Sequence, residues 1–155
     1  MLPAASILVY GYGNPGRQDD GLGIALLEHL EQWAKREGPA QLTFDSNYQL
    51  NAEDALTISA HDVVVFVDAT KEGAEPFSFQ QIKPRATIAF STHAMTPESV
   101  LALCTELYGK QPVAYLLAIH GYEWEPNAKL TPAAQANLTA AQEFITVWLQ
   151  NQLAK

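Results

Sequence analysis

The segment Ser6-Ile-Leu-Val-Tyr10, followed directly by Gly11-Tyr-Gly-Asn-Pro-Gly16, decides the fold of this chain. Its first five residues form a short, nearly continuous apolar run that ends at glycines, which is typical of a buried parallel strand. Beyond the glycines, leucines and Trp33 recur at helical spacing and predict an amphipathic helix over residues 20–36. A strand, a glycine-rich turn and a helix in this order begin an α/β domain.

The rest of the chain continues this alternation of strands and helices. Residues 62–67 give the strongest strand pattern, β-branched and apolar on both faces, whereas residues 77–82 alternate like an edge strand. Further strands are predicted at 41–44, 85–90 and 113–119, and further helices at 51–58, 96–108 and 131–149. We therefore expect an α/β fold, a three-layer sandwich in which a mostly parallel, twisted sheet of about five strands is flanked by helices, as a single domain over residues 1–155.

The composition limits the kinds of partner. The chain has 155 residues, of which 48% are apolar, and a formal net charge of −8. Nucleic acid is an unfavourable partner, because binding to phosphate depends on lysine and arginine. The apolar runs are far shorter than the roughly 20 residues of a membrane span, and the N-terminus lacks the basic region of a signal peptide. We expect no nucleic acid, no membrane contact and a cytoplasmic location.

Acidic and imidazole side chains follow several predicted strands. Asp20, Asp45, Asp68 and His93 all fall where the carboxyl ends of parallel strands meet, which is the edge that binds ligands in α/β sheets. Asp20, Asp68 and His93 form the sharpest group, because two carboxylates and one imidazole suit a divalent transition metal and leave coordination positions open. Without a metal, the crowded carboxylates would have raised pKa values and would act as an acid/base pair.

The glycine loop has two further interpretations. Gly11, Gly13 and Gly16 fit the GxGxxG pattern of a small nucleotide-binding module, in which the loop binds a pyrophosphate. Asp19 and Asp20 oppose this interpretation, because they would repel the phosphates. Alternatively, the loop is only a tight strand-to-helix turn in which Asp19 or Asp20 caps the helix.

The loop motif resembles that of a known family. Gly11-Tyr-Gly-Asn14 followed by Asp19-Asp20-Gly21-Leu-Gly23 is similar to the opening signature of the [NiFe]-hydrogenase maturation proteases, GxGN-x4-D(D/E)GxG. The resemblance continues in order along essentially the whole chain. Phe66-Val-Asp68-Ala69 is similar to the family's strand-end aspartate, and Ser91-Thr-His93 is similar to its histidine segment. Ile119–Pro126 followed by Leu130-Thr-Pro132 resembles its closing strand, acidic loop and last helix.

This resemblance implies an endopeptidase. Members of the family recognise the nickel-loaded precursor of the hydrogenase large subunit and remove a short C-terminal peptide from it. Asp20, Asp68 and His93 match the family's metal-contacting positions, and Asp45 matches a further acidic position on the second strand. The resemblance therefore implies nickel supplied by the substrate, no organic cofactor and the large-subunit precursor as partner. We expect the protein to act as a monomer.

The sequence leaves open how the attacking water is activated and whether the protein cleaves its partner at all. The attacking water is activated either by a carboxylate, Asp20 or Asp45, or by the metal, which lowers the pKa of the water. A non-proteolytic nickel-binding chaperone would use the same three ligands, but it would bind the metal tightly by itself, whereas a protease of this kind needs only weak binding without its precursor. The residues expected to form the loop that meets the substrate are Gly11, Gly13, Asn14 and Asp19.

Overall fold

A five-stranded sheet forms the centre of the computed structural model, which describes residues 5–37, 39–86 and 95–154. Its strands follow the order β2-β1-β3-β5-β4, and the first four of these are parallel while β4 pairs antiparallel with β5 at the edge. The strands are β1 (Ile7–Tyr12), β2 (Leu42–Asn47), β3 (Val63–Thr70), β4 (Phe77–Ile82) and β5 (Val113–His120). The predicted fold class and the predicted edge strand are confirmed.

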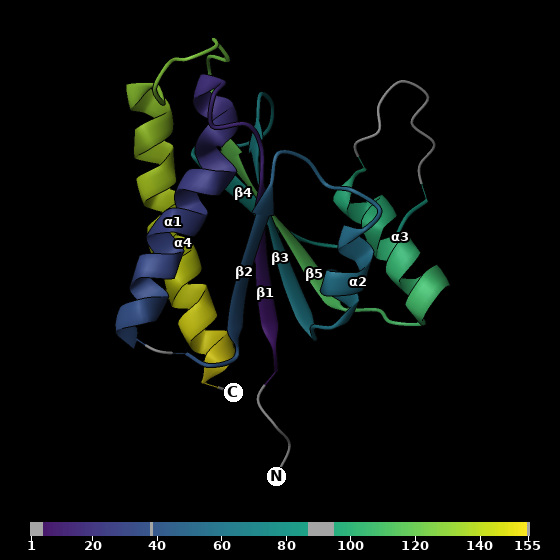
Figure 1. Cartoon of the computed structure of the whole chain (residues 1–155). Coiled ribbons are helices and arrows are strands. Elements are labelled where there is room, and N and C mark those ends of the chain that lie inside the picture. The colour runs from purple at the N-terminus through teal and green to yellow at the C-terminus, as the bar shows by residue number, and fades with distance from the viewer. Residues whose placement is uncertain (1–4, 38, 87–94, 155) are drawn as a thin grey trace.

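Helices cover both faces of the sheet (Figure 1), with α1 and α4 on one face and α2 and α3 on the other. The helices are α1 (Leu22–Glu37), α2 (Asp54–Ser59), α3 (Pro97–Tyr108) and α4 (Pro132–Leu153), and a short 3-10 turn, η1 (Gln18–Gly21), precedes α1. Thr96 and Thr131 cap α3 and α4, because each hydroxyl accepts a hydrogen bond from a backbone N–H three residues later and each is followed by proline. None of the described helices is both long and apolar enough to cross a membrane.

Two hydrophobic cores lie on the two faces of the sheet. On β1, Val9 packs into the core beneath α1 and α4, whereas Leu8 and Tyr10 pack into the core beneath α2 and α3. The central strands β1 and β3 are therefore buried on both sides, which explains why their sequences read as continuous apolar runs. This burial fixes the carboxyl ends of the two strands next to each other.

Several element boundaries differ from those expected. β2 and β3 extend beyond residues 44 and 67, so that Asp45 and Asp68 lie within strands rather than after them. β3 continues because β5 pairs with it as far as Thr70 and His120. Residues 85 and 86 of the predicted strand at 85–90 are not in a strand, and the remaining four lie outside the described residues.

Candidate active site

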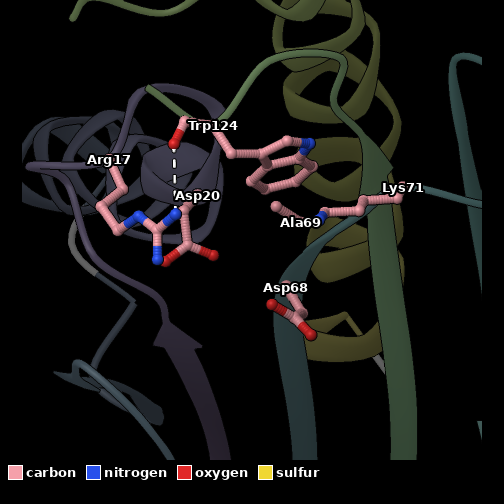
Figure 2. Close-up of a pocket in the computed structure, with 6 residues that line it drawn as sticks. All are labelled: Arg17, Asp20, Asp68, Ala69, Lys71 and Trp124. Atoms are coloured by element: carbon pink, nitrogen blue, oxygen red, sulfur yellow. Dashed lines mark hydrogen bonds between the residues drawn. The ribbon is translucent and has the colours of Figure 1, made fainter. Parts of the chain in front are cut away.

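Asp20 and Asp68 line one pocket of about 310 Å³ at the carboxyl edge of the sheet. Asp20 lies in η1, directly after the loop that follows β1, and Asp68 lies near the end of β3. Figure 2 shows the two carboxylates together with the four other lining residues, Arg17, Ala69, Lys71 and Trp124. The structure thus brings together two of the three predicted metal ligands.

The third predicted ligand, His93, lies outside the described residues, between Ala86 and Met95. Within the described ranges, no group of three or more histidine, cysteine, aspartate or glutamate side chains is arranged to hold a metal ion. The described part of the site therefore consists of two carboxylates, and the complete three-residue site stays a prediction.

The glycine loop is shaped by close internal contacts. Gly13 has a φ of +138°, and a Cβ atom there would lie 2.1 Å from the backbone oxygen of Asp20. A Cβ on Gly11 would lie 2.6 Å from the side chain of Leu27 and 2.7 Å from the backbone oxygen of Gly23. These glycines let η1 and the start of α1 approach β1 directly, so their presence is explained without a bound phosphate.

Asp20 is held by the same loop. Its Oδ2 atom accepts a hydrogen bond of 2.8 Å from the backbone N–H of Asn14. The side-chain oxygen of Asn14 in turn accepts from the backbone N–H of Gly16 at 2.9 Å. The amide that a nucleotide-binding loop would offer to a phosphate is thus already bound to a carboxylate, which argues against the nucleotide-binding interpretation.

Asp19 has a different environment, although it is adjacent to Asp20. It is fully buried, and its Oδ2 atom accepts hydrogen bonds from the backbone of Tyr122 and Glu123 and from the hydroxyl of Thr131, while Oδ1 accepts from the backbone of Thr131. Burial by itself raises the pKa of Asp19, but these hydrogen bonds outweigh it and hold the pKa below its ordinary value. Asp19 fixes the segment after β5 in place, and its side chain caps neither η1 nor α1.

The carboxyl group of Asp68 is hard to ionise. Burial raises its pKa to about 7, and the nearby negative charge of Asp20 adds to this, while hydrogen bonds from the backbone of Ala69 and from Tyr12 act in the opposite direction. Burial and the Asp68 charge also raise the pKa of the Tyr12 hydroxyl. A cation placed between the two carboxylates would relieve both the burial cost and their mutual repulsion.

Asp45 lies on β2, the neighbouring strand of β1. It pairs in register with Tyr10 on the neighbouring strand, so its side chain is on the face covered by α2 and α3. Its Oδ1 atom accepts a hydrogen bond from the backbone of Ser46 at 2.8 Å, and its charge is one of the causes that raise the pKa of Tyr10, after burial and Asp54. The residues that line the pocket with Asp20 and Asp68 do not include Asp45.

Three residues of the pocket were missed by sequence reasoning. Arg17, Lys71 and Trp124 come from the segments that follow β1, β3 and β5. No short motif joins them, because they are distant in the sequence. Their position just after predicted strands is the signal in the sequence that could identify them.

The fold is that of the [NiFe] hydrogenase maturation proteases, as comparison with solved structures shows. One match is the maturation protease HycI from Thermococcus kodakarensis KOD1, with a TM-score of 0.73 and 22% identity over 97% of this chain and 94% of that one. Another is the hydrogenase maturating endopeptidase HybD from E. coli, with a TM-score of 0.76 and 22% identity over 94% and 93% of the two chains. A third is a hydrogenase 2 maturation peptidase from Thaumarchaeota archaeon SCGC_AB-539-E09, with a TM-score of 0.67 and 20% identity over 93% and 97%.

No protein-family model matches the sequence, and no curated protein matches it. At these levels of identity the structural comparisons confirm the fold that the sequence resemblance implied. The chemistry of this chain has to be argued from its own site.

Proposed function

We propose that this protein is an endopeptidase that removes the C-terminal peptide of a nickel-loaded [NiFe]-hydrogenase large-subunit precursor. The observation that carries the proposal is the pocket in which Asp20 and Asp68 meet at the carboxyl ends of the sheet. Solved structures that share the fold over more than nine-tenths of this chain support it, among them a maturation protease, a maturating endopeptidase and a maturation peptidase of hydrogenases.

Nickel enters this reaction as part of the substrate. Asp20 and Asp68 supply hard oxygen donors, and His93 supplies an imidazole, which is a set suited to a divalent transition metal. Because burial and the charge of Asp20 raise the pKa of Asp68, a cation bound between the two carboxylates favours the state in which both are ionised. Docking would therefore test whether the precursor carries nickel, and it would position the scissile peptide beside the pocket.

The hydrolysis needs a base for the attacking water. The water oxygen bonds to the scissile carbonyl carbon, the C–N bond breaks, and the proton taken from the water is returned to the departing amine. Asp20 is better placed than Asp45 to hold that proton, because Asp20 lines the pocket and Asp45 does not. We extend the proposal to a monomeric, cytoplasmic enzyme that needs no organic cofactor.

Nickel-loaded and nickel-free precursor should be incubated with the protein while the mass of the precursor C-terminus is followed. We expect only the loaded form to lose its peptide, and we expect Asp20→Asn and His93→Ala to abolish this loss while the fold is kept. Asp62→Asn is a matched control, since Asp62 directly precedes the first residue of β3 and lies outside this pocket. Equal cleavage of both precursors would overturn the role of nickel, and wild-type rates in the two variants would overturn the site.

Three measurements on the protein distinguish the rival functions: thermal stabilisation by ligands, nickel binding and the mass of the precursor. A nucleotide-binding module would be stabilised against heat by ATP or NADH and not by nickel. A nickel chaperone would hold nickel tightly without precursor and would leave the mass of the precursor unchanged. The protease predicts cleavage, together with weak nickel binding when the precursor is absent.

A further inference from the structure

The pocket has a second side that the proposed reaction does not use. Beside the two carboxylates it is lined by the guanidinium of Arg17, the ammonium of Lys71 and the indole of Trp124 (Figure 2). A site made only to hold a divalent cation gains nothing from two further cations nearby, because each of them repels the metal. The composition of the pocket therefore points to a ligand that brings negative charge as well as positive charge.

The two basic side chains are free to bind such a charge. Within the part of the chain that the structure describes, neither Arg17 nor Lys71 forms an ion pair, although both line the pocket that contains Asp20 and Asp68. Both side chains are exposed, and the guanidinium of Arg17 makes one hydrogen bond to the described residues, to the backbone oxygen of Trp124 at 3.3 Å. The other guanidinium N–H groups remain available to an acceptor.

These groups are also held in place before a ligand arrives. The hydrogen bond from Arg17 joins the segment after β1 to the segment after β5, and the ammonium of Lys71 lies over the indole of Trp124, 5.3 Å from its centre. The indole rests on Gly121, where a Cβ atom would lie 3.1 Å from the ring. Asp19 anchors the same segment through Tyr122 and Glu123.

The two loops that carry Lys71 and Trp124 are joined a second time. The hydroxyl of Tyr122 hydrogen-bonds to the carboxylate of Glu75, and the side-chain amide of Asn137 donates to that hydroxyl at 3.0 Å. The backbone of Gly121 also donates to the oxygen of Thr70 at 2.9 Å. Two cations and an indole on loops fixed in this way form a preorganised anion site with an apolar wall.

We propose that Arg17, Lys71 and Trp124 form a subsite for a carboxylate of the precursor's C-terminal segment. The guanidinium and ammonium bind the carboxylate, and the indole contacts the apolar part of the residue that carries it. This inference rests on the proposed function, since it assumes that a peptide occupies the pocket. The carboxylate belongs either to an acidic side chain of the segment or to its C-terminus, and the chemistry of recognition is the same in both cases.

The test uses a synthetic peptide of the precursor's C-terminal segment, labelled with fluorescein at its N-terminus, and measures binding by fluorescence anisotropy without metal. Three modified peptides are compared: one with an amidated C-terminus, one with its acidic side chains replaced by amides, and one with both changes. We expect the doubly neutralised peptide to bind about tenfold more weakly, because charge-assisted hydrogen bonds are lost. The singly neutralised peptide that shows this loss identifies the carboxylate.

The protein variants complete the test. Lys71→Gln should weaken binding of the unmodified peptide about tenfold and should cause no further loss with the neutralised peptide, whereas Lys71→Arg should bind as the wild type does. Lys110→Gln is the matched control, because Lys110 is exposed near the opposite end of the sheet. Equal binding of all four peptides, no binding of any, or wild-type affinity in Lys71→Gln would overturn the subsite.

Processing of the nickel-loaded precursor separates this inference from the proposed function. In Lys71→Gln we expect the KM to rise about tenfold with little change in kcat, because the residue binds the segment and takes no part in breaking the bond. Carboxylate-dependent peptide binding without any cleavage would refute the protease and keep the subsite. Cleavage whose KM is unchanged in Lys71→Gln would refute the subsite and keep the protease.

Discussion

Replacing Asp68 by asparagine should make the protein more stable at pH 8 and change its stability little at pH 4. The carboxyl group is partly buried and faces the charge of Asp20, so its pKa is about 7 in the folded chain against an ordinary value of 3.8. Asparagine has nearly the same shape and keeps an oxygen that accepts a hydrogen bond from Tyr12. It lacks the charge that the fold disfavours.

The sign and size of the effect follow from proton linkage. Below pH 3.8 the carboxyl is protonated in both states, and between pH 3.8 and about 7 the folded state holds the proton more firmly than the unfolded state does. The free energy of unfolding therefore falls as the pH rises through this window, and the stability from the held proton is lost above about pH 7. The difference between a pKa of about 7 in the folded chain and one of 3.8 in the unfolded chain corresponds to an upper bound of about 4 kcal/mol.

Urea unfolding at pH 4, 6 and 8 measures this difference directly. The free energy of unfolding of Asp68→Asn minus that of the wild type should grow with pH, by up to about 4 kcal/mol. Asp68→Ala is the matched control. It removes the same charge, so its free energy of unfolding relative to the wild type should increase with pH by the same amount. At every pH that free energy should be lower than the value for Asp68→Asn, because alanine offers no acceptor to Tyr12. A difference that is equal at pH 4 and pH 8, or that shrinks as the pH rises, would refute the reasoning.

Three other predictions concern the turn and the core. Asp19→Asn should lower the free energy of unfolding at pH 7 by about 3 kcal/mol, because an amide cannot accept every hydrogen bond that the buried carboxylate accepts. Since the pKa of Asp19 is held below its ordinary value of 3.8, this loss of stability should shrink as the pH falls below 3.8 and the folded state takes up the proton. Urea unfolding of both proteins at pH 7 and at a pH below 3.8 measures the change, and an equal loss at the two pH values would contradict it. Gly13→Ala should cost clearly more stability than Gly73→Ala, because both glycines have positive φ but only a Cβ on Gly13 meets another atom, and equal losses in thermal unfolding would contradict this. Cys104 should resist iodoacetamide in the native protein at pH 8, because the thiol is buried and burial raises its pKa to about 11, and fast labelling seen by mass spectrometry would show this to be wrong.

Local patterns predicted most of the fold because each of them reports a local physical requirement. The runs in β1 and β3 are apolar on both faces, which only burial between two helical layers explains. The Thr-Pro pairs at Thr96 and Thr131 marked the starts of α3 and α4, since capping depends on the next three residues alone.

Boundaries were less predictable wherever contacts with segments distant in the sequence determine them. β3 runs past Val67 because β5 offers backbone groups for pairing as far as His120. α4 runs to Leu153, four residues beyond the expected end, and Leu149 and Leu153 pack in the core beneath α1 and α4. Neither partner can be read from the segment itself, because the contact is made by residues distant in the sequence.

The sequence by itself determined the α/β fold, the glycine turn after the first strand and the placing of Asp20 and Asp68 at one edge of the sheet. Only the tertiary structure decided that Asp19, one residue from Asp20, is buried away from the pocket and bonded to the segment after β5. It also brought Arg17, Lys71 and Trp124 together. Burial and charge at a point in space depend on every segment that packs there, whereas a sequence pattern records only the neighbours along the chain.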